Sequence, residues 1–396
     1  MSAYACEPHK GSEPGAGWNW ALAAAQRNDV WVITRANNRA AIEATAAGLE
    51  RTPTFVYVEA PSVARFWKRS GHGIRSYYIL WQLVAHRAAR RLHSEIGFDV
   101  VHHVTFANLW LPALARLPGV PFVLGPVGGG PRVPLRLFKE IGVGGVSVEV
   151  LRRMAQLASR LNPLVSLTWR HADIVLAQNE ETRDALPGSV RARTHVRTNA
   201  SVDTLPLEPA NANRKQLVAV FAGRLVGWKG AGLAIRALHK APRWQLRIIG
   251  SGPRRTMLQG LASSLGVADR VMFVPWLPHP RLLNELRKAD ALVMPSLRED
   301  AGFVAAEARA VGTDVIAFAR AGAAAMAALD PLGFHLVPLR SVDESAARIA
   351  AALNKIEASS APPSRAFSVG RIAIDIDRVY VEATREPVMV GAKAES

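Results

Sequence analysis

The feature that most constrains the fold is a repeated unit of strand, short loop and helix, clearest between Ala289 and Ala308. The run Ala289-Asp-Ala-Leu-Val-Met294 has the length and β-branched content of a buried strand. The segment from Phe303 to Val311 is rich in Ala and free of Gly and Pro, which favours a helix. Such units place their loops at the carboxyl ends of strands, where open α/β sheets bind ligands.

The loop of this unit carries candidate ligand contacts. Free backbone N–H groups at Gly302 and Phe303 would attract an anion, above all a phosphate, to the helix amino terminus. Glu299 precedes the helix and Glu307 lies one turn into it, and each carboxylate can accept hydrogen bonds from neighbouring hydroxyls of a sugar or ribose. The same two residues could simply complement the helix dipole. Taken alone, the pair does not decide between these interpretations.

The alternation of strands and helices continues along the 396 residues, which predicts an α/β protein with parallel sheets in two domains. Residues 198–213 are polar and proline-bearing, so they are the best linker candidate. Only about five residues precede the first glycine-punctuated loop, so either the first strand is stunted or the true start lies upstream of Met1. The single cysteine, Cys6, fits a reducing compartment. No signal segment or bilayer-spanning apolar run is evident, so we expect a cytoplasmic protein, or one peripheral to the cytoplasmic membrane face.

The positive charge is concentrated in one region. The formal net charge is +17, and residues 51–170 hold 16 Lys and Arg against 5 Asp and Glu. This asymmetry indicates an anionic partner, either membrane lipid or a phosphorylated acceptor. Within Ser62 to Ile96, aromatic and basic residues alternate. This pattern is typical of a helix on an anionic membrane, and equally of an amphipathic helix that packs its aromatics on a sheet; we favour the latter.

A second glycine loop, Gly223-Arg-Leu-Val-Gly-Trp-Lys-Gly230, adds cations to the same half of the chain. Arg224 and Lys229 extend from a predicted strand–loop–helix turn. Two cations beside a helix amino terminus suit a diphosphate. A single glycine loop could be only a tight turn. Several such loops together with the carboxylate pair favour a ligand site.

With these motifs the sequence resembles retaining glycosyltransferases of family 4, and the likeness covers about residues 2–320. The motifs that carry it are Gly223-Arg-Leu-(x)3-Lys-Gly230, Ile249-Gly-Ser-Gly-Pro253, Val271-Met-Phe273, Ala289-Asp-Ala-Leu-Val-Met-Pro-Ser296, Glu299-(x)7-Glu307, Gly11-Ser-Glu-Pro-Gly-Ala-Gly-Trp18, Phe98-Asp-Val-Val-His-His103, Pro126-Val-Gly-Gly-Gly130 and His171-Ala-Asp-Ile-Val175. The resemblance implies the GT-B fold, two Rossmann-like parallel-sheet domains facing each other across a cleft. We place the acceptor domain at 1–197, joined by a tail helix at about 372–396, and the donor domain at 198–371.

The resemblance also implies roles for individual residues. Arg224 and Lys229 would grip the donor diphosphate, and the N–H groups of Gly302 and Phe303 would complete the cradle. Glu299 would hold the transferred sugar, and Glu307 the ribose. The donor-binding set further includes Gly15, Gly17, Gly223 and Gly252, with Gly15 and Gly17 letting the first domain approach the donor.

Some positions depart from the family pattern. Many relatives carry His-x-His where this chain has adjacent His102 and His103. Because neighbouring strand residues point oppositely, only one of the two should reach the donor sugar. Which of them does so stays open. Asp314 stands where proline is common, and Arg320-Ala-Gly-Ala323 replaces a Gly-Gly turn. No metal or other cofactor is expected. The sole Asp-x-Asp, at Asp375 and Asp377, falls in the predicted tail helix at 372–384, where residues two apart face different ways.

The leading hypothesis is a retaining glycosyltransferase that moves a sugar from a nucleotide-diphospho-sugar to a hydroxyl of a glycan or lipid-linked acceptor, in cell-surface polysaccharide or glycolipid biosynthesis. The alternative is a catalytically inactive relative that senses nucleotide-sugars or serves as a partner subunit. Nucleic acid is a weaker hypothesis, because no zinc spacing, recognition helix or RNA-binding aromatic motif supports it.

Overall fold

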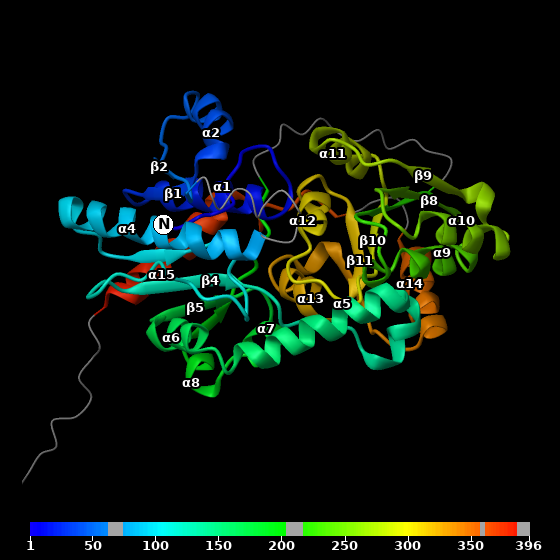
Figure 1. The fold of residues 1–396 in the computed structure, drawn as a ribbon. Helices are drawn as coiled ribbons and strands as arrows, with labels where there is room; N and C mark the ends of the chain where they lie inside the picture. The colour runs from blue at the N-terminus through cyan, green and yellow to red at the C-terminus, as the bar shows by residue number, and fades with distance from the viewer. Residues whose placement is uncertain (62–73, 203–216, 357–360, 386–396) are drawn as a thin grey trace, which may run out of the picture.

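The computed structural model describes residues 1–61, 74–202, 217–356 and 361–385. Two parallel sheets lie side by side, each flanked by helices (Figure 1). The linker candidate and the segment with Phe66 and Trp67 fall largely outside the described residues.

The first sheet is joined through the first residues of the chain. Ser2 forms parallel bridges to both Ile33 and His103, and its N–H donates to the carbonyl of His102 at 2.8 Å. Residues 1–4 therefore replace a full first strand between β1 and β3, and connect pairs that would otherwise be separate. The strands of this sheet are β1 (Trp31–Arg35), β2 (Thr54–Val58), β3 (Val101–His103), β4 (Phe122–Val127), β5 (Ile174–Ala177) and β6 (Thr194–Val196).

The helices of this half include one correction to the sequence-based expectation. The sequence pattern predicts a glycine-punctuated loop up to Trp18, but the first helix already begins at Ser12, so this loop is partly helical. The helices are α1 (Ser12–Ala25), α2 (Arg39–Ala46), α4 (Ile74–Ile96), α5 (Phe138–Ser159), α6 (Pro163–His171), α7 (Glu180–Asp184) and α8 (Gly188–Arg191).

The aromatic residues of α4 face the protein core. Tyr77, Tyr78 and Trp81 are buried in one cluster with Tyr4 and Ile33. The exposed side of the helix carries arginines. The described aromatics are therefore an ordinary packing face, as the favoured interpretation predicted.

The second sheet has the strand order β12-β11-β10-β7-β8-β9 and is parallel throughout. Large apolar clusters cover both of its faces. The strands are β7 (Leu217–Ala222), β8 (Trp244–Ile249), β9 (Val271–Val274), β10 (Ala291–Met294), β11 (Asp314–Phe318) and β12 (Phe334–Val337), and the helices are α9 (Ala231–His239), α10 (Arg255–Ser264), α11 (His279–Arg287), α12 (Phe303–Ala310), α13 (Ala321–Ala327) and α14 (Val342–Lys355).

The last helix, α15 (Val369–Thr384), returns to the first half of the molecule. Ile372 and Ile376 are buried in one cluster with Trp20 of α1, and in Figure 1 the red helix lies beside the first sheet. Asp375 and Asp377 belong to this helix and lie near arginines, Asp375 at 3.7 Å from Arg371 and Asp377 at 3.6 Å from Arg27. The two carboxylates of the Asp-x-Asp pair therefore have separate arginine partners.

Asp314, one of the departures from the family pattern, is part of a buried ion network. The guanidinium of Arg309, only 1% exposed, donates to Asp330 at 2.7 Å and to the carbonyls of Thr313 and Pro362. Asp314 lies 3.8 Å from the same guanidinium and is itself buried. The carboxylate thus has a buried cation beside it.

Replacing Arg309 with Met should leave two buried carboxylates without their cation. We expect Arg309→Met to lower the free energy of unfolding by about 3–5 kcal/mol, as measured by denaturant titration. Arg348→Met, on the exposed side of α14, is the matched control and should change it by less than about 0.5 kcal/mol. Equal effects of the two substitutions would contradict the role of the network.

Candidate active site

A cavity of about 1010 Å³ lies between the two sheets at the carboxyl ends of their strands. Both halves of the chain line it. The second half contributes Gly223, Arg224, Trp228, Lys229, Arg298, Glu299, Gly302 and Phe303, and the first half contributes Ser12, Glu13, Phe106, Asn108, Gly128, Gly129 and Gln178. Six of the sequence-predicted site residues therefore meet in one cleft.

The loop after β10 carries the centre of this cleft. The Nζ of Lys229 lies 2.5 Å from Oε2 of Glu299, and the hydroxyl of Ser296 donates to the same oxygen at 3.1 Å. Gly302 adopts a left-handed conformation, with φ of 78°, and forms the N-cap of α12. Glycine adopts this conformation without strain. A cation, a carboxylate and a helix amino terminus thus converge on one side of the cleft.

Arg224 comes from the loop after β7 and its side chain is exposed to the cleft. Gly252 does not line the cavity; a side chain there would collide with the backbone of Leu225. The absence of a side chain at Gly252 therefore lets the loop that carries Arg224 lie close to the neighbouring loop.

Glu307 lies deeper in the same half, 6% exposed, and faces His279 at the start of α11. Nε2 of His279 lies 3.0 Å from Oε1 of Glu307. This hydrogen bond raises the pKa of His279 and outweighs the opposite effect of burial. Gly11 of the first half lies close to both side chains. Glu307 is therefore already engaged with a partner beside the cleft.

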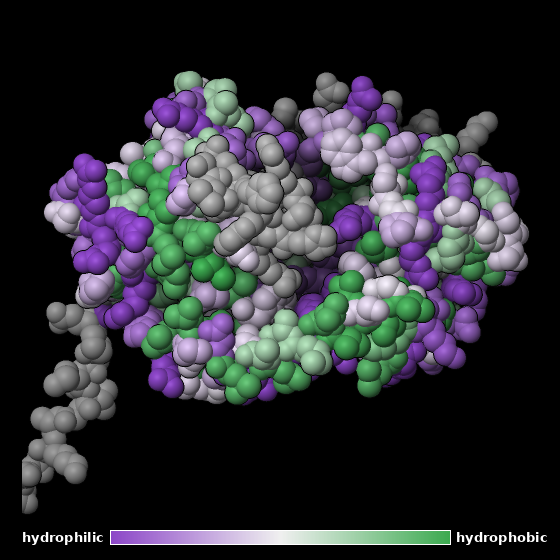
Figure 2. All heavy atoms as spheres, in the orientation of Figure 1, coloured by the Kyte–Doolittle hydropathy of each residue, from purple (hydrophilic) through white to green (hydrophobic). Residues whose placement is uncertain are grey.

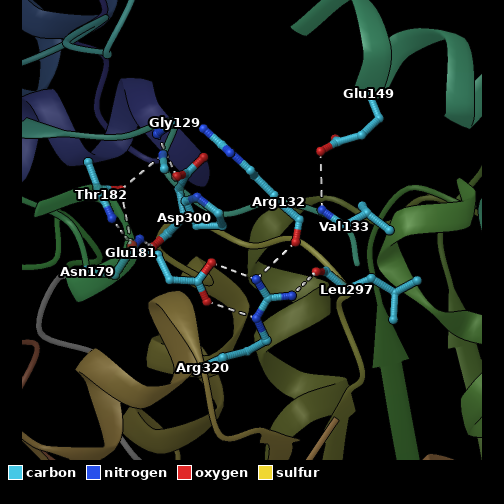
Figure 3. Close-up of polar contacts among 12 residues, drawn as sticks. Gly129, Arg132, Val133, Glu149, Asn179, Glu181, Thr182, Leu297, Asp300 and Arg320 are labelled. Atoms are coloured by element: carbon cyan, nitrogen blue, oxygen red, sulfur yellow. Dashed lines mark hydrogen bonds and ion pairs between the residues drawn. The ribbon is translucent and has the colours of Figure 1, made fainter. Parts of the chain in front are cut away.

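Polar contacts from the first half of the chain hold the loop after β10 in place (Figure 3). The N–H of Gly129 donates to the carboxylate of Asp300 at 2.7 Å, and the amide of Asn179 donates to the Asp300 carbonyl at 2.8 Å. Arg320 donates to both carboxylate oxygens of Glu181, at 2.9 and 2.6 Å. Arg320, part of the altered Gly-Gly turn, therefore joins the halves.

Two carboxyl groups at the cleft have a raised pKa. Burial raises the pKa of Asp300, although the Gly129 N–H acts against it. Burial also raises the pKa of Glu13, although its carboxylate accepts a hydrogen bond from the N–H of Phe106 at 2.5 Å. Sequence reasoning selected neither residue, even though Asp300 adjoins Glu299 and Glu13 lies in the Gly11–Trp18 motif. The positions of Asp300 and Glu13 depend on contacts with residues that are distant from them in the sequence.

The histidine prediction requires correction. His102 is 1% exposed and His103 is 0% exposed, and neither lines the cleft. His102 contacts the carbonyl of Gly125 and the hydroxyl of Tyr380, while His103 contacts the hydroxyl of Tyr78 at 2.8 Å. Burial lowers the pKa of His102 to about 3 and that of His103 to about 4. The two rings do point to opposite sides, but both are internal packing residues.

Gly15 and Gly17 also do not line the cleft. Side chains there would collide with the carbonyl oxygens of Lys10 and Ala5. These glycines allow α1 to pack against the loop that precedes it, whereas Ser12 and Glu13 are the residues of this segment that reach the cavity.

Two negative observations concern the described residues only. Across residues 1–61, 74–202, 217–356 and 361–385, no group of three or more His, Cys, Asp or Glu side chains could hold a metal ion. In the same part of the chain, no helix combines the length and apolarity needed to cross a membrane.

The His279–Glu307 contact makes a testable prediction. Because the pKa of His279 is raised in the folded protein, the pair stabilises it at pH 6 and loses this contribution as the pH rises through that pKa. NMR titration of the imidazole should give a lower His279 pKa in Glu307→Gln than in the wild type. Glu285→Gln, on the same helix α11, should leave it unchanged; identical values in all three proteins would contradict the contact.

Comparisons with known proteins find similarity to glycosyltransferases. The family model "Glycosyl transferases group 1" matches residues 207–366. D-inositol 3-phosphate glycosyltransferase of Mycobacteroides abscessus is 38% identical over 133 residues, which are 32% of this chain and 30% of that protein. The chain thus spans under a third of the length of this relative. 2-Deoxystreptamine glucosyltransferase of Streptomyces kanamyceticus is 25% identical over 312 residues, 74% of this chain and 76% of that protein.

Solved structures show the fold. Sucrose-phosphate synthase from Thermosynechococcus elongatus has a TM-score of 0.60 at 19% identity, covering 94% of this chain and 93% of its own. HepE from Anabaena, solved in complex with UDP, has a TM-score of 0.55 at 18% identity, covering 94% and 98%. The predicted GT-B fold is confirmed. Residues 207–366 thus match the glycosyl transferases group 1 family, and the chain is similar to glycosyltransferases beyond that domain.

Proposed function

We propose that the protein is a retaining, metal-independent glycosyltransferase that moves a sugar from a nucleotide-diphospho-sugar to an acceptor hydroxyl. The observation that carries the proposal is the convergence of Lys229, Glu299 and the Gly302 N-cap of α12 on one cleft between two parallel-sheet domains. Cations and a helix amino terminus suit a diphosphate, and a carboxylate suits sugar hydroxyls. A nucleotide-diphospho-sugar donor carries both a diphosphate and sugar hydroxyls, so it would use both kinds of contact.

The donor would lie along the second sheet. Arg224 and Lys229 bind the diphosphate beside the N–H groups of Gly302 and Phe303, while Glu299 binds the transferred sugar. Glu307, held by His279, lies beside the cleft for the ribose. UDP in the HepE structure, which shares the fold, supports a nucleotide in this cleft.

The chemistry would use the donor itself as the base. In front-face transfer, the leaving diphosphate takes the proton of the acceptor hydroxyl as the new glycosidic bond forms. Lys229 would release Glu299, its partner at 2.5 Å, and stabilise the charge that develops on the leaving group. Neither glutamate is a nucleophile in this scheme, and the buried histidines take no part.

The acceptor class follows from the charge of the first half. We expect a glycan or lipid-linked acceptor of cell-surface polysaccharide or glycolipid synthesis, reached by a cytoplasmic protein that is peripheral on an anionic membrane. The excess of 11 positive charges in residues 51–170, the difference between 16 basic and 5 acidic residues, supports this location. The relatives named for D-inositol 3-phosphate and 2-deoxystreptamine support a ring acceptor rich in hydroxyls.

Glu299 provides the first test. Glu299→Ala should abolish sugar transfer, because the transferred sugar loses its hydroxyl partner, and should leave nucleoside-diphosphate binding measurable by calorimetry. Glu95→Ala, on the exposed side of α4, is the control and should retain full turnover. Unchanged turnover in Glu299→Ala would contradict the proposal.

The two cations provide the second test. In the double variant Arg224→Ala/Lys229→Ala, the loss of both charges should weaken binding of a nucleoside diphosphate at least tenfold, while binding of the matching nucleoside changes little. Calorimetric titration with UDP and uridine, or with the corresponding GDP and ADP pairs, measures the difference. Equal losses for diphosphate and nucleoside would show that the cations do not contact the diphosphate.

A further inference from the structure

After a kink at Gly142, helix α5 has its polar and apolar residues reversed relative to an ordinary surface helix, whereas Ile141 before the kink packs in the core. Its buried side holds Glu149, Gln156 and Ser159, while Arg152 donates inward to the carbonyls of Gly129 and Pro131. Surface helices normally turn their apolar stripe toward the core. The outward side of α5 therefore needs an explanation other than core packing.

That outward side is a continuous apolar surface. Spacings of three, four and seven residues place the apolar residues on one side of the helix, and the series continues into α6. In Figure 2, hydrophobic residues follow α5 along the lower edge of the molecule. We name this surface the α5–α6 face; its members, each between 43% and 88% exposed, are Val143, Val150, Leu151, Met154, Leu157, Leu161, Leu164 and Leu167.

Within residues 131–172, every exposed charged side chain is basic, although the exposed Asp184 lines a hollow together with Arg160. Residues 131–172 are all described, and their exposed charged side chains are Arg132, Arg136, Lys139, Arg160 and Arg170. The two acidic residues of this segment do not add to the exposed surface: Glu149 is buried against Arg298 at 2.5 Å, and Glu140 is half-buried. A basic rim around an apolar ridge matches the headgroups and acyl chains of an anionic membrane.

A second copy of the chain fits the face less well. In a two-fold dimer the same patch meets itself, so the arginines at the two ends of the ridge would approach those of the partner. Such like-charge contacts oppose association, whereas anionic lipid neutralises them.

We propose that the α5–α6 face docks on an anionic membrane, with its leucines and Met154 in the acyl boundary and the flanking arginines at the headgroups. The inference rests on the peripheral location in the proposed function and does not depend on sugar transfer. It assigns docking to α5 and α6 and not to the buried aromatics of α4. Through Arg152 and Gln156, which both donate to the Gly129 carbonyl, the docking helix also supports a wall of the cleft.

Vesicle co-sedimentation tests the inference directly. The full chain should bind vesicles of phosphatidylglycerol and phosphatidylcholine and bind at least tenfold less to phosphatidylcholine alone. The triple variant Leu151→Ser/Met154→Ser/Leu157→Ser should lose at least tenfold in binding to the anionic vesicles. Leu332→Ser is the matched control, because Leu332 is 75% exposed but lies outside the face. Equal thermal midpoints would verify that the variants fold.

Two results would overturn the inference. One is a wild-type protein that does not bind anionic vesicles, or a triple variant that binds them as well as the wild type does. The other is a wild-type dimer in light scattering that the triple variant abolishes, which would make the face a self-interface. Calorimetric measurement of nucleotide binding on the same samples separates failure of the docking from failure of the proposed function. A protein that binds nucleotide but not vesicles contradicts only the docking.

Discussion

The candidate site depends on one contact between the two halves of the chain, the hydrogen bond from the Gly129 N–H to the half-buried carboxylate of Asp300. Asp300 lies between Glu299, which faces the cleft, and Gly302, which caps α12. Anchoring residue 300 on the first domain therefore sets the position of the whole loop. Arg298, on the other side of Glu299, is anchored to Glu149 of α5. This side of the cleft is thus built from the second sheet and fixed by the first domain.

In the proposed function, the charges held by this anchoring would bind a diphosphate between two sugars. Lys229 and Glu299 neutralise each other while no ligand is present, and a diphosphate would draw the lysine away and free the carboxylate for hydroxyls. The carboxylate pair of the sequence, Glu299 and Glu307, is accordingly split between two partners, Lys229 and His279. Each glutamate has its own hydrogen-bonding partner, which favours a clamp for hydroxyls over an acid–base pair.

The sequence predicted the second half of the chain better than the first. The strand β10, the helix α12 and the loop between them follow from local patterns, since apolar runs, glycines and charges lie within a few residues of one another. The errors in the first half concern partners distant in the chain. His102 is engaged by Tyr380, 278 residues away, and the space that Gly15 and Gly17 leave is taken by the preceding loop. The reversed α5 could not be foreseen, because its polar residues meet partners that no local pattern reveals.

The most direct test of the account is a thermal-shift screen of the purified chain with UDP-, GDP- and ADP-sugars, each compared with its free nucleoside. The account predicts that at least one nucleotide-diphospho-sugar raises the melting temperature through binding to the folded state, while its nucleoside raises it far less. If no nucleotide-diphospho-sugar shifts the transition, or if nucleosides shift it equally, the assignment of the cleft to a diphospho-sugar donor is contradicted.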